Sequence, residues 1–233
     1  MSPASFLSLL ALAGSAAAFK PCHMPYTPFT KSVESPCFTT AGSLPRGVSV
    51  RNYDAAVDNG ATVVTSSVSA ALQPWQDGLE ISTGYVFEYF TGNGNAAGAD
   101  LTAYLTAPLM FQPARGNTSS AQPWSAAMVL QPSKWPATSK PPSPARGFVE
   151  LATFGPLQLA VLHRSLKSPP SESDFQACDV ELRKVVAASG QWTVDAENPH
   201  TPTFAFYFPR DDEPPTKGPY NFECWVAVVA AEN

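Results

Sequence analysis

Residues 75–95, WQDGLEISTGYVFEYFTGNGN, decide the fold that we expect for this chain. Their apolar side chains recur at spacings of four and seven residues, which places one apolar stripe on a helix: Trp75, Leu79, Val86 and Phe90. Pro74 suits the first helical turn, and the cluster Gly92-Asn93-Gly94 ends the helix. The stretch therefore predicts an amphipathic helix that packs on a core.

Short runs of β-branched and aromatic residues flank this helix and predict strands. The two strands before it, 48–54 and 60–68, are separated by the turn signal Asp58-Asn59-Gly60, which predicts a hairpin. Two strands follow it, at 100–106 and 125–131. After a proline-rich linker at 132–146 the order repeats, with strands 148–154 and 157–164 in a second hairpin about Gly155-Pro156, a helix at 171–189, and strands at 203–209 and 221–229.

Strand, strand, helix, strand, strand, twice over, indicates a duplicated α+β unit. We expect its two helices to lie on a curved antiparallel sheet. Alternation in the late strands, as in Phe204, Phe206 and Phe208, gives each of them an apolar face. Between sheet and helices we expect a pocket.

The N-terminus predicts a signal peptide at residues 1–18. An apolar run at 6–13 precedes the Ala-Ala-Ala of residues 16–18, a pattern that signal peptidase accepts, and the run is too short to span a membrane, which takes ~20 residues. No later stretch could span a bilayer. We therefore expect a secreted or lumenal protein. Phe19 after the alanines also resembles the junction of plastid-targeting leaders in algae with complex plastids, so that compartment is the alternative.

Residues 19–47, rich in Pro, Ser and Thr, predict an extended arm pinned by its cysteines, and residues 48–233 predict one domain. The chain carries 14 basic residues and a net charge of −5, which argues against nucleic acid as a partner. Four cysteines in an oxidising compartment favour disulfides. Sequence alone leaves the pairing open; we favour Cys22 with Cys37, and Cys178 with Cys224. Asn117-Thr118-Ser119 is a glycosylation sequon.

The sequence has no nucleophile elbow, no zinc-binding His-Glu-x-x-His, no P-loop and no dinucleotide fingerprint after a predicted strand. His23 and His200 lie in predicted loops. His163 ends a strand on the same face as Leu157, Leu159 and Val161, where it could ligate a haem iron or bond to backbone or solvent.

Five strings resemble the SOUL haem-binding family and stand in the order of that family: Val50-Arg51-Asn52-Tyr53, residues 86–95, Thr106-Ala107-Pro108-Leu109, Glu223-Cys224-Trp225 and Pro25-Tyr26-Thr27. The resemblance implies a distorted antiparallel β-barrel of two pseudo-repeated ββαββ units with two helices packed on the outside. It also implies a haem or other tetrapyrrole held without covalent attachment. Carried over by position, the ligand would contact Val86, Phe87, Phe90, Phe206 and Phe208.

The charge of the predicted helix does not favour haem propionates, because residues 75–90 carry Glu80 and Glu88 and no basic residue to pair with them. Arg51 or Arg164 would have to supply that charge.

The leading expectation is a non-catalytic tetrapyrrole carrier, buffer or scavenger, with protein partners unknown. A lipocalin-like binder of another apolar metabolite is the nearest alternative. A hydrolase on a related duplicated barrel is another, with Glu150 and Glu223 as its inner-strand carboxylates. A protein-interaction module with a vestigial pocket is the last.

Overall fold

The computed structural model describes residues 22–26, 33–53, 61–68, 75–113, 124–131, 135, 140–154, 156–198, 202–207 and 219–232. Several sequence-based predictions lie outside these residues: the signal peptide, the turn at 58–60, the sequon at Asn117, His200 and the ligand residue Phe208.

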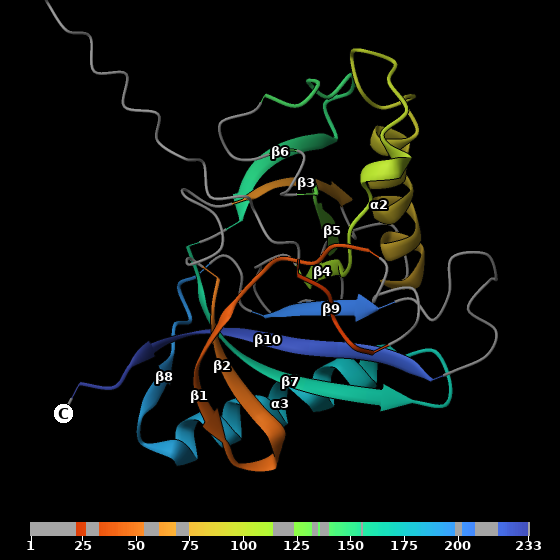
Figure 1. The fold of residues 1–233 in the computed structure, drawn as a ribbon. Coiled ribbons are helices and arrows are strands. Elements are labelled where there is room, and N and C mark those ends of the chain that lie inside the picture. The colour runs from red at the N-terminus through yellow and green to blue at the C-terminus, as the bar shows by residue number, and fades with distance from the viewer. Residues whose placement is uncertain are drawn as a thin grey trace, which may run out of the picture.

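One sheet of ten strands forms the body of the described chain, with two α-helices against it (Figure 1). In chain order the elements are β1 Thr39–Leu44, the 3-10 helix η1 Pro45–Gly47, β2 Val48–Asn52, β3 Ala61–Val68, α2 Trp75–Phe90, the 3-10 helix η3 Thr102–Tyr104, β4 Leu109–Pro113, β5 Trp124–Val129, β6 Val149–Phe154, β7 Gln158–Leu166, α3 Glu172–Ser189, β8 Trp192–Val194, β9 Thr203–Tyr207 and β10 Tyr220–Ala230.

The strand order is β1-β2-β7-β10-β9-β4-β5-β3-β6, and β8 pairs with β10 beside this path. Every pairing is antiparallel. The α+β class and the mostly antiparallel sheet are therefore confirmed. The predicted closed barrel is not, because the pairing of the described residues leaves the sheet open between β1 and β6.

Both predicted hairpins are wrong. β2 pairs with β1 and β7, while β3 pairs with β5 and β6; likewise β7 pairs with β2 and β10 and not with β6. In each case the strand before the turn signal pairs elsewhere in the sheet and not with the strand that follows the turn signal. A turn signal says that the chain changes direction; which strand it meets is decided by packing elsewhere in the sheet.

Two further strand assignments change. The predicted strand at 100–106 is wrong, because the Asp100 carboxylate accepts hydrogen bonds from the Thr102 amide at 2.9 Å and from its hydroxyl at 2.6 Å, starting η3 in place of a strand. The strand begins only at Leu109, as β4. The predicted arm also contains a strand: β1 lies at the edge of the sheet with mostly exposed side chains, so it has no apolar alternation to reveal it.

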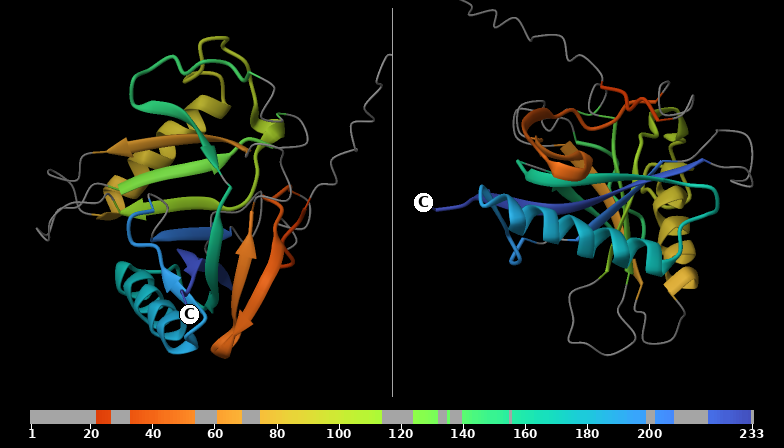
Figure 2. Two further views of the ribbon diagram at one scale, coloured as in Figure 1. Left: turned by 90° about the vertical axis from the view of Figure 1, so that its left-hand side faces the viewer. Right: turned by 90° about the horizontal axis from the view of Figure 1, so that it is seen from below.

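Each side of the sheet has its own core. On one side α2 packs on β3 and β5 and α3 packs on β7, β8 and β10, as two views show (Figures 1 and 2). Alternation along β10 sends Phe222 and Cys224 to this side, and Trp225 and Ala227 to the other. We call the second side the helix-free face. The candidate site lies there.

Helix α3 is fixed at both ends and along its length. Ser171 and Asp174 form a capping box at its start, and Gly190 adopts a left-handed conformation after its end. The disulfide Cys178–Cys224 ties it to β10, and a second disulfide, Cys22–Cys37, closes the N-terminal arm. Both favoured pairings are confirmed. Among the described helices, none has the length and apolarity required to cross a bilayer.

Candidate active site

Glu223 is the centre of the site. It lies in the middle of β10, points to the helix-free face and has no solvent-exposed surface. Five hydrogen bonds reach its two carboxylate oxygens. Oε1 accepts hydrogen bonds from Arg51 Nη2 at 2.8 Å and from the Tyr26 hydroxyl at 2.5 Å. Oε2 accepts hydrogen bonds from Arg51 Nη1 at 3.1 Å, from the Tyr207 hydroxyl at 2.8 Å and from Trp225 Nε1 at 2.8 Å. Such a carboxylate is fully satisfied although it is out of water.

Arg51 reaches Glu223 from β2, two strands away, because β7 lies between β2 and β10. The planar guanidinium grips both carboxylate oxygens at once, the geometry that makes this ion pair strong and directional. Its Nε donates to the Ser49 hydroxyl at 3.1 Å, and the ring of Phe38 lies 4.3 Å below the guanidinium carbon. Arg51 is itself 7% exposed, so this is a buried pair.

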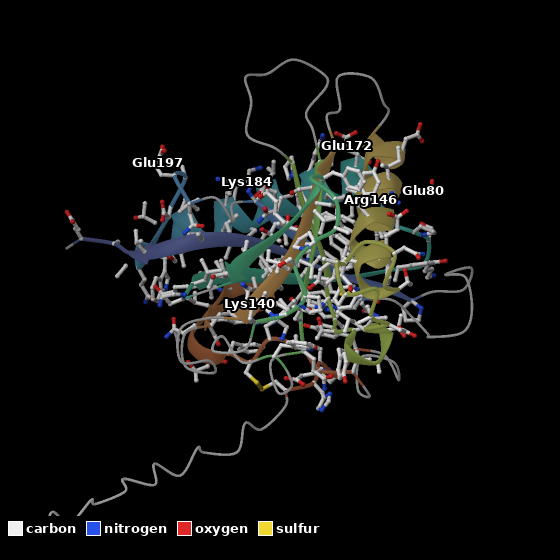
Figure 3. The ribbon with its side chains drawn as sticks, turned by 90° about the horizontal axis from the view of Figure 1, so that it is seen from above. Glu80, Lys140, Arg146, Glu172, Lys184 and Glu197 are labelled. Atoms are coloured by element: carbon white, nitrogen blue, oxygen red, sulfur yellow. A yellow bond between two sulfur atoms is a disulfide. The ribbon has the colours of Figure 1, made fainter. Side chains whose placement is uncertain are left out.

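Aromatic rings wall the pair. Tyr53 and Trp225 contact each other with ring centres 5.6 Å apart, and the Tyr53 hydroxyl lies 3.4 Å from Arg51 Nη1. Tyr26 stacks on the imidazole of His163 at 4.2 Å and meets Tyr207 edge to face at 4.8 Å. Other charged side chains are exposed, such as Glu80 on α2 and Lys184 on α3 (Figure 3).

The charges of the site follow from these contacts. Burial alone would raise the pKa of Glu223, but the charge and hydrogen bonds of Arg51, with those of Tyr26 and Trp225, hold it below the ordinary glutamate value. Burial alone would lower the pKa of Arg51, but the attraction of the Glu223 carboxylate raises it above the ordinary arginine value. Burial, followed by the charge of Glu223, raises the pKa of Tyr26 and Tyr207. At neutral pH the site holds a carboxylate, a guanidinium and phenols that keep their protons.

A segment of the arm covers the site. We call residues 22–26 and 33–38 the covering segment. The disulfide Cys22–Cys37, the hydrogen bond that the Ser35 backbone N–H donates to the Cys22 carbonyl at 2.7 Å and the His23–Val33 contact hold it together. In Figure 1 the red segment crosses in front of β9 and β10, and Figure 2 places it on the opposite side of the sheet from α3.

A row of side chains connects this centre to a cleft. Strand pairing aligns, across the helix-free face, His163, Glu223, Ala205, Met110, Ala127, Thr65 and Glu150. Met110, Ala127 and Thr65 line a cleft of about 170 Å³ together with residues of β3, β4, β6 and β9. A cavity of ~150 Å³ is enough for one benzene ring. Only the small Ala205 separates the cleft from Glu223 along this row.

The residues predicted to hold a tetrapyrrole do not come together around one. Val86 and Phe90 are fully covered in the core between α2 and the sheet; Phe87 and Phe206 are half-buried against that core. Arg51 lies on the helix-free face. A flat ligand cannot contact both sides of a continuous sheet, so Arg51 cannot join the other four residues around one ligand.

His163 also lacks the setting of an axial ligand. Its Nε2 is 3.1 Å from the Asn221 amide oxygen, and Tyr26 covers one face of its ring. Burial lowers its pKa despite the nearby charge of Glu223, so the imidazole is neutral. No cluster of three or more metal-ligating side chains occurs within the described ranges. Haem binding stays a prediction.

The two carboxylates named from the sequence lie in different environments. Glu223 is buried, whereas Glu150 is exposed on β6 at the far end of the same row. Sequence analysis missed Tyr26, Tyr207 and Trp225 as partners of Glu223. Trp225 could have been found, because in a strand it shares a face with Glu223 two residues away. The contact of Tyr26 spans 197 residues and has no local signal.

Comparison with known proteins gives distant likenesses only. No family model matches the chain, and no curated protein matches it. Among solved structures, a hydrolase from Listeria innocua is similar with a TM-score of 0.46 and 11% identity, over 81% of this chain and 94% of that one. An uncharacterized conserved protein from Listeria innocua (TM-score 0.44, 11% identity, 73% and 89% covered) and a second hydrolase from that organism (0.43, 10%, 73% and 88%) follow.

Two of these three proteins are named hydrolases, which contradicts the prediction that the chain is not an enzyme. We do not retain that prediction.

Proposed function

We propose that the chain is a hydrolase that binds a small ester on the helix-free face, with Glu223 as the general base that activates water. The observation that carries the proposal is an ionised carboxylate, fully buried, on which five hydrogen bonds from four side chains converge.

Stability alone is a poor explanation of this pair. Removing two charges from water is costly, and well-packed apolar residues of similar volume are often as stabilising as a buried ion pair, or more so. Six ionisable groups with shifted pKa values gather here, counting Tyr26, Arg51, Tyr53, His163, Tyr207 and Glu223. Such clusters are typical of functional sites.

The groups divide the work of ester hydrolysis between them. Glu223 stays unprotonated because of Arg51, so it can take a proton from water. Tyr207 and Trp225 donate to the same carboxylate and hold its orientation. The Tyr26 hydroxyl, 2.5 Å from Oε1, marks where a water oxygen would sit once the covering segment moves away.

The test compares Glu223→Gln with Glu150→Gln in the full chain, assayed by the acid released from phenyl butyrate and ethyl butyrate. General base catalysis typically contributes ~10²–10⁴-fold, so we expect Glu223→Gln to lose at least 100-fold in kcat/KM. Glu150→Gln, exposed on the same row, should retain the activity of the unmodified chain. Equal rates for the two variants, or no turnover of either ester by the unmodified chain, would contradict the proposal.

The internal order of the sheet supports a second, structural proposal. We propose that the chain consists of two copies of one ββαββ unit. The halves β2-β7-β10-β9 and β6-β3-β5-β4 have the same order once β2 and β6 are exchanged between the copies, and each half carries one helix. The resemblance to the SOUL family implies the same two ββαββ units.

A further inference from the structure

We propose that the site around Glu223 accepts a hydroxy-aromatic group, and that the substrates of the chain are esters whose leaving group is a phenol. The inference rests on the proposed function, because it names the substrate of that hydrolysis. What carries it is Tyr26, which occupies the site in the way that a bound ligand would.

The contacts of Tyr26 are those of a phenol in a binding site. One face of its ring lies parallel to the His163 imidazole, with ring centres 4.2 Å apart and planes 8° apart. Its edge meets Tyr207 at 72°, and its hydroxyl donates to the Glu223 carboxylate at 2.5 Å. Ring stacking supplies contact area, and the hydrogen bond to a charged acceptor selects a hydroxyl over a hydrogen atom.

Tyr26 does not belong to the paired strands that form the rest of the site, although its segment packs on them through the buried Met24. In the described part of the arm, residues 22–26 pair only through the bridge of Cys22 with Ser35, inside the covering segment. Arg51, His163, Tyr207 and Glu223 stand on paired strands. Tyr26 can therefore leave without breaking a strand pairing, and what replaces it meets a preformed surface.

The chemistry of an aryl ester fits this surface. Glu223 takes one proton from water, and the water oxygen forms a bond to the acyl carbon. The bond between that carbon and the aryl oxygen breaks, and protonated Glu223 returns its proton to the departing aryl oxide. The products are a carboxylic acid and a phenol, and the phenol then donates to the ionised carboxylate as Tyr26 does.

The row toward the cleft gives the acyl part a place. From Glu223 it passes the small Ala205 to Met110 and Ala127, at the strand spacing of ~4.8 Å for each step. The cleft of about 170 Å³ there has room for a short acyl chain or one ring.

Binding of p-cresol, the side chain of tyrosine without its backbone, tests this inference by calorimetric titration of the full chain. In Tyr26→Ala the vacated site should bind p-cresol at least tenfold more tightly than the unmodified chain does, since Tyr26 no longer competes. Toluene, which lacks the hydroxyl, should bind this variant at least tenfold more weakly than p-cresol. Equal affinities for p-cresol and toluene would overturn the inference, as would absence of p-cresol binding by the folded variant.

Tyr26→Phe keeps the ring and removes only the hydroxyl, so it serves where Tyr26→Ala does not fold. Its affinity for p-cresol should exceed that of the unmodified chain severalfold, whereas the matched change Tyr85→Phe, on α2, should leave the affinity unchanged. No increase in Tyr26→Phe would overturn the inference. If Glu223→Gln loses hydrolysis but p-cresol does not bind, the hydrolase proposal stands and the phenol site is refuted. If p-cresol binds but no ester is hydrolysed, the hydrolase proposal is refuted and only the binding of a hydroxy-aromatic group stands.

Discussion

Removing Arg51 should expose how much the fold depends on its ion pair with Glu223. In Arg51→Met the carboxylate keeps its burial but loses two hydrogen bonds and its counter-charge. Breaking one side of a buried pair typically costs ~3–5 kcal/mol, compared with ~0.3–0.5 kcal/mol for an exposed pair on a helix. The matched control is Arg183→Met, whose pair with Asp179 at 2.9 Å lies on α3 with side chains 35% and 19% exposed.

Guanidinium unfolding followed by tryptophan fluorescence measures both variants. At pH 7 we expect Arg51→Met to lose about 3–5 kcal/mol of the free energy of unfolding and Arg183→Met to lose under ~1 kcal/mol. The double variant Arg51→Met/Glu223→Leu should lose less than the sum of its single changes. A loss in Arg51→Met no larger than in the control would refute the account of this site.

The same variant predicts a pH dependence with a definite sign. Without Arg51, burial raises the pKa of Glu223 above its unfolded value, so the folded state gains a proton there as the pH falls. The loss of stability in Arg51→Met should therefore shrink between pH 7 and pH 4. If it grew on acidification, Glu223 would not be the group left without a partner.

Three further outcomes are expected. In the unmodified chain the pKa of Glu223 is lowered, so the stability it contributes is present above the ordinary glutamate value of ~4.3 and is lost as the pH falls further; Glu223→Gln should flatten this acid limb in a pH series of unfolding curves. Replacing both Cys178 and Cys224 by Ala should lower the free energy of unfolding by about 4 kcal/mol, from the 46-residue separation of the bridge, and a loss under ~1 kcal/mol would argue against a stabilising bridge. Gly94→Ala should destabilise by ~1–3 kcal/mol, because an added Cβ would lie 2.7 Å from the Tyr89 amide nitrogen. Gly84→Ala, with open space around it on α2, should stabilise by ~0.5–1 kcal/mol. In thermal unfolding the midpoint temperatures of the two variants should shift in opposite directions.

Local patterns predicted the elements whose signals are local. α2 ends at Phe90 as the glycine cluster indicates, and α3 has the Ser171 start and the Gly190 end that the sequence implies. Cys178 lies on the buried stripe of α3 and Cys224 on the same side of β10, so that pairing could be favoured. Such features depend on residues a few positions apart.

Pairing between distant strands could not be predicted in the same way. β2 meets β7 through registers such as Ser49 with Val161, and nothing near Ser49 encodes that partner. The site shares this difficulty. Glu223 was visible as an inner-strand carboxylate, but its burial depends on Arg51, 172 residues away, and on the covering segment. Arg51 was grouped with the predicted ligand residues of α2 but lies on the other side of the sheet, because alternation alone does not say which face meets the helices.

The pairing of β2 with β7 and of β3 with β6 has a consequence for how the chain acquires its structure. A chain that emerges N-terminus first presents β2 long before β7 exists to receive it, and β3 waits in the same way for β6. These pairings join strands far apart in the sequence and must form before the molecule gains much stability, which slows folding. Arg51 meets Glu223 only after β10 is made, near the C-terminus. A ribosome-bound chain truncated before β10 should therefore remain open to protease, and release of the last strand should make protection appear in a single step.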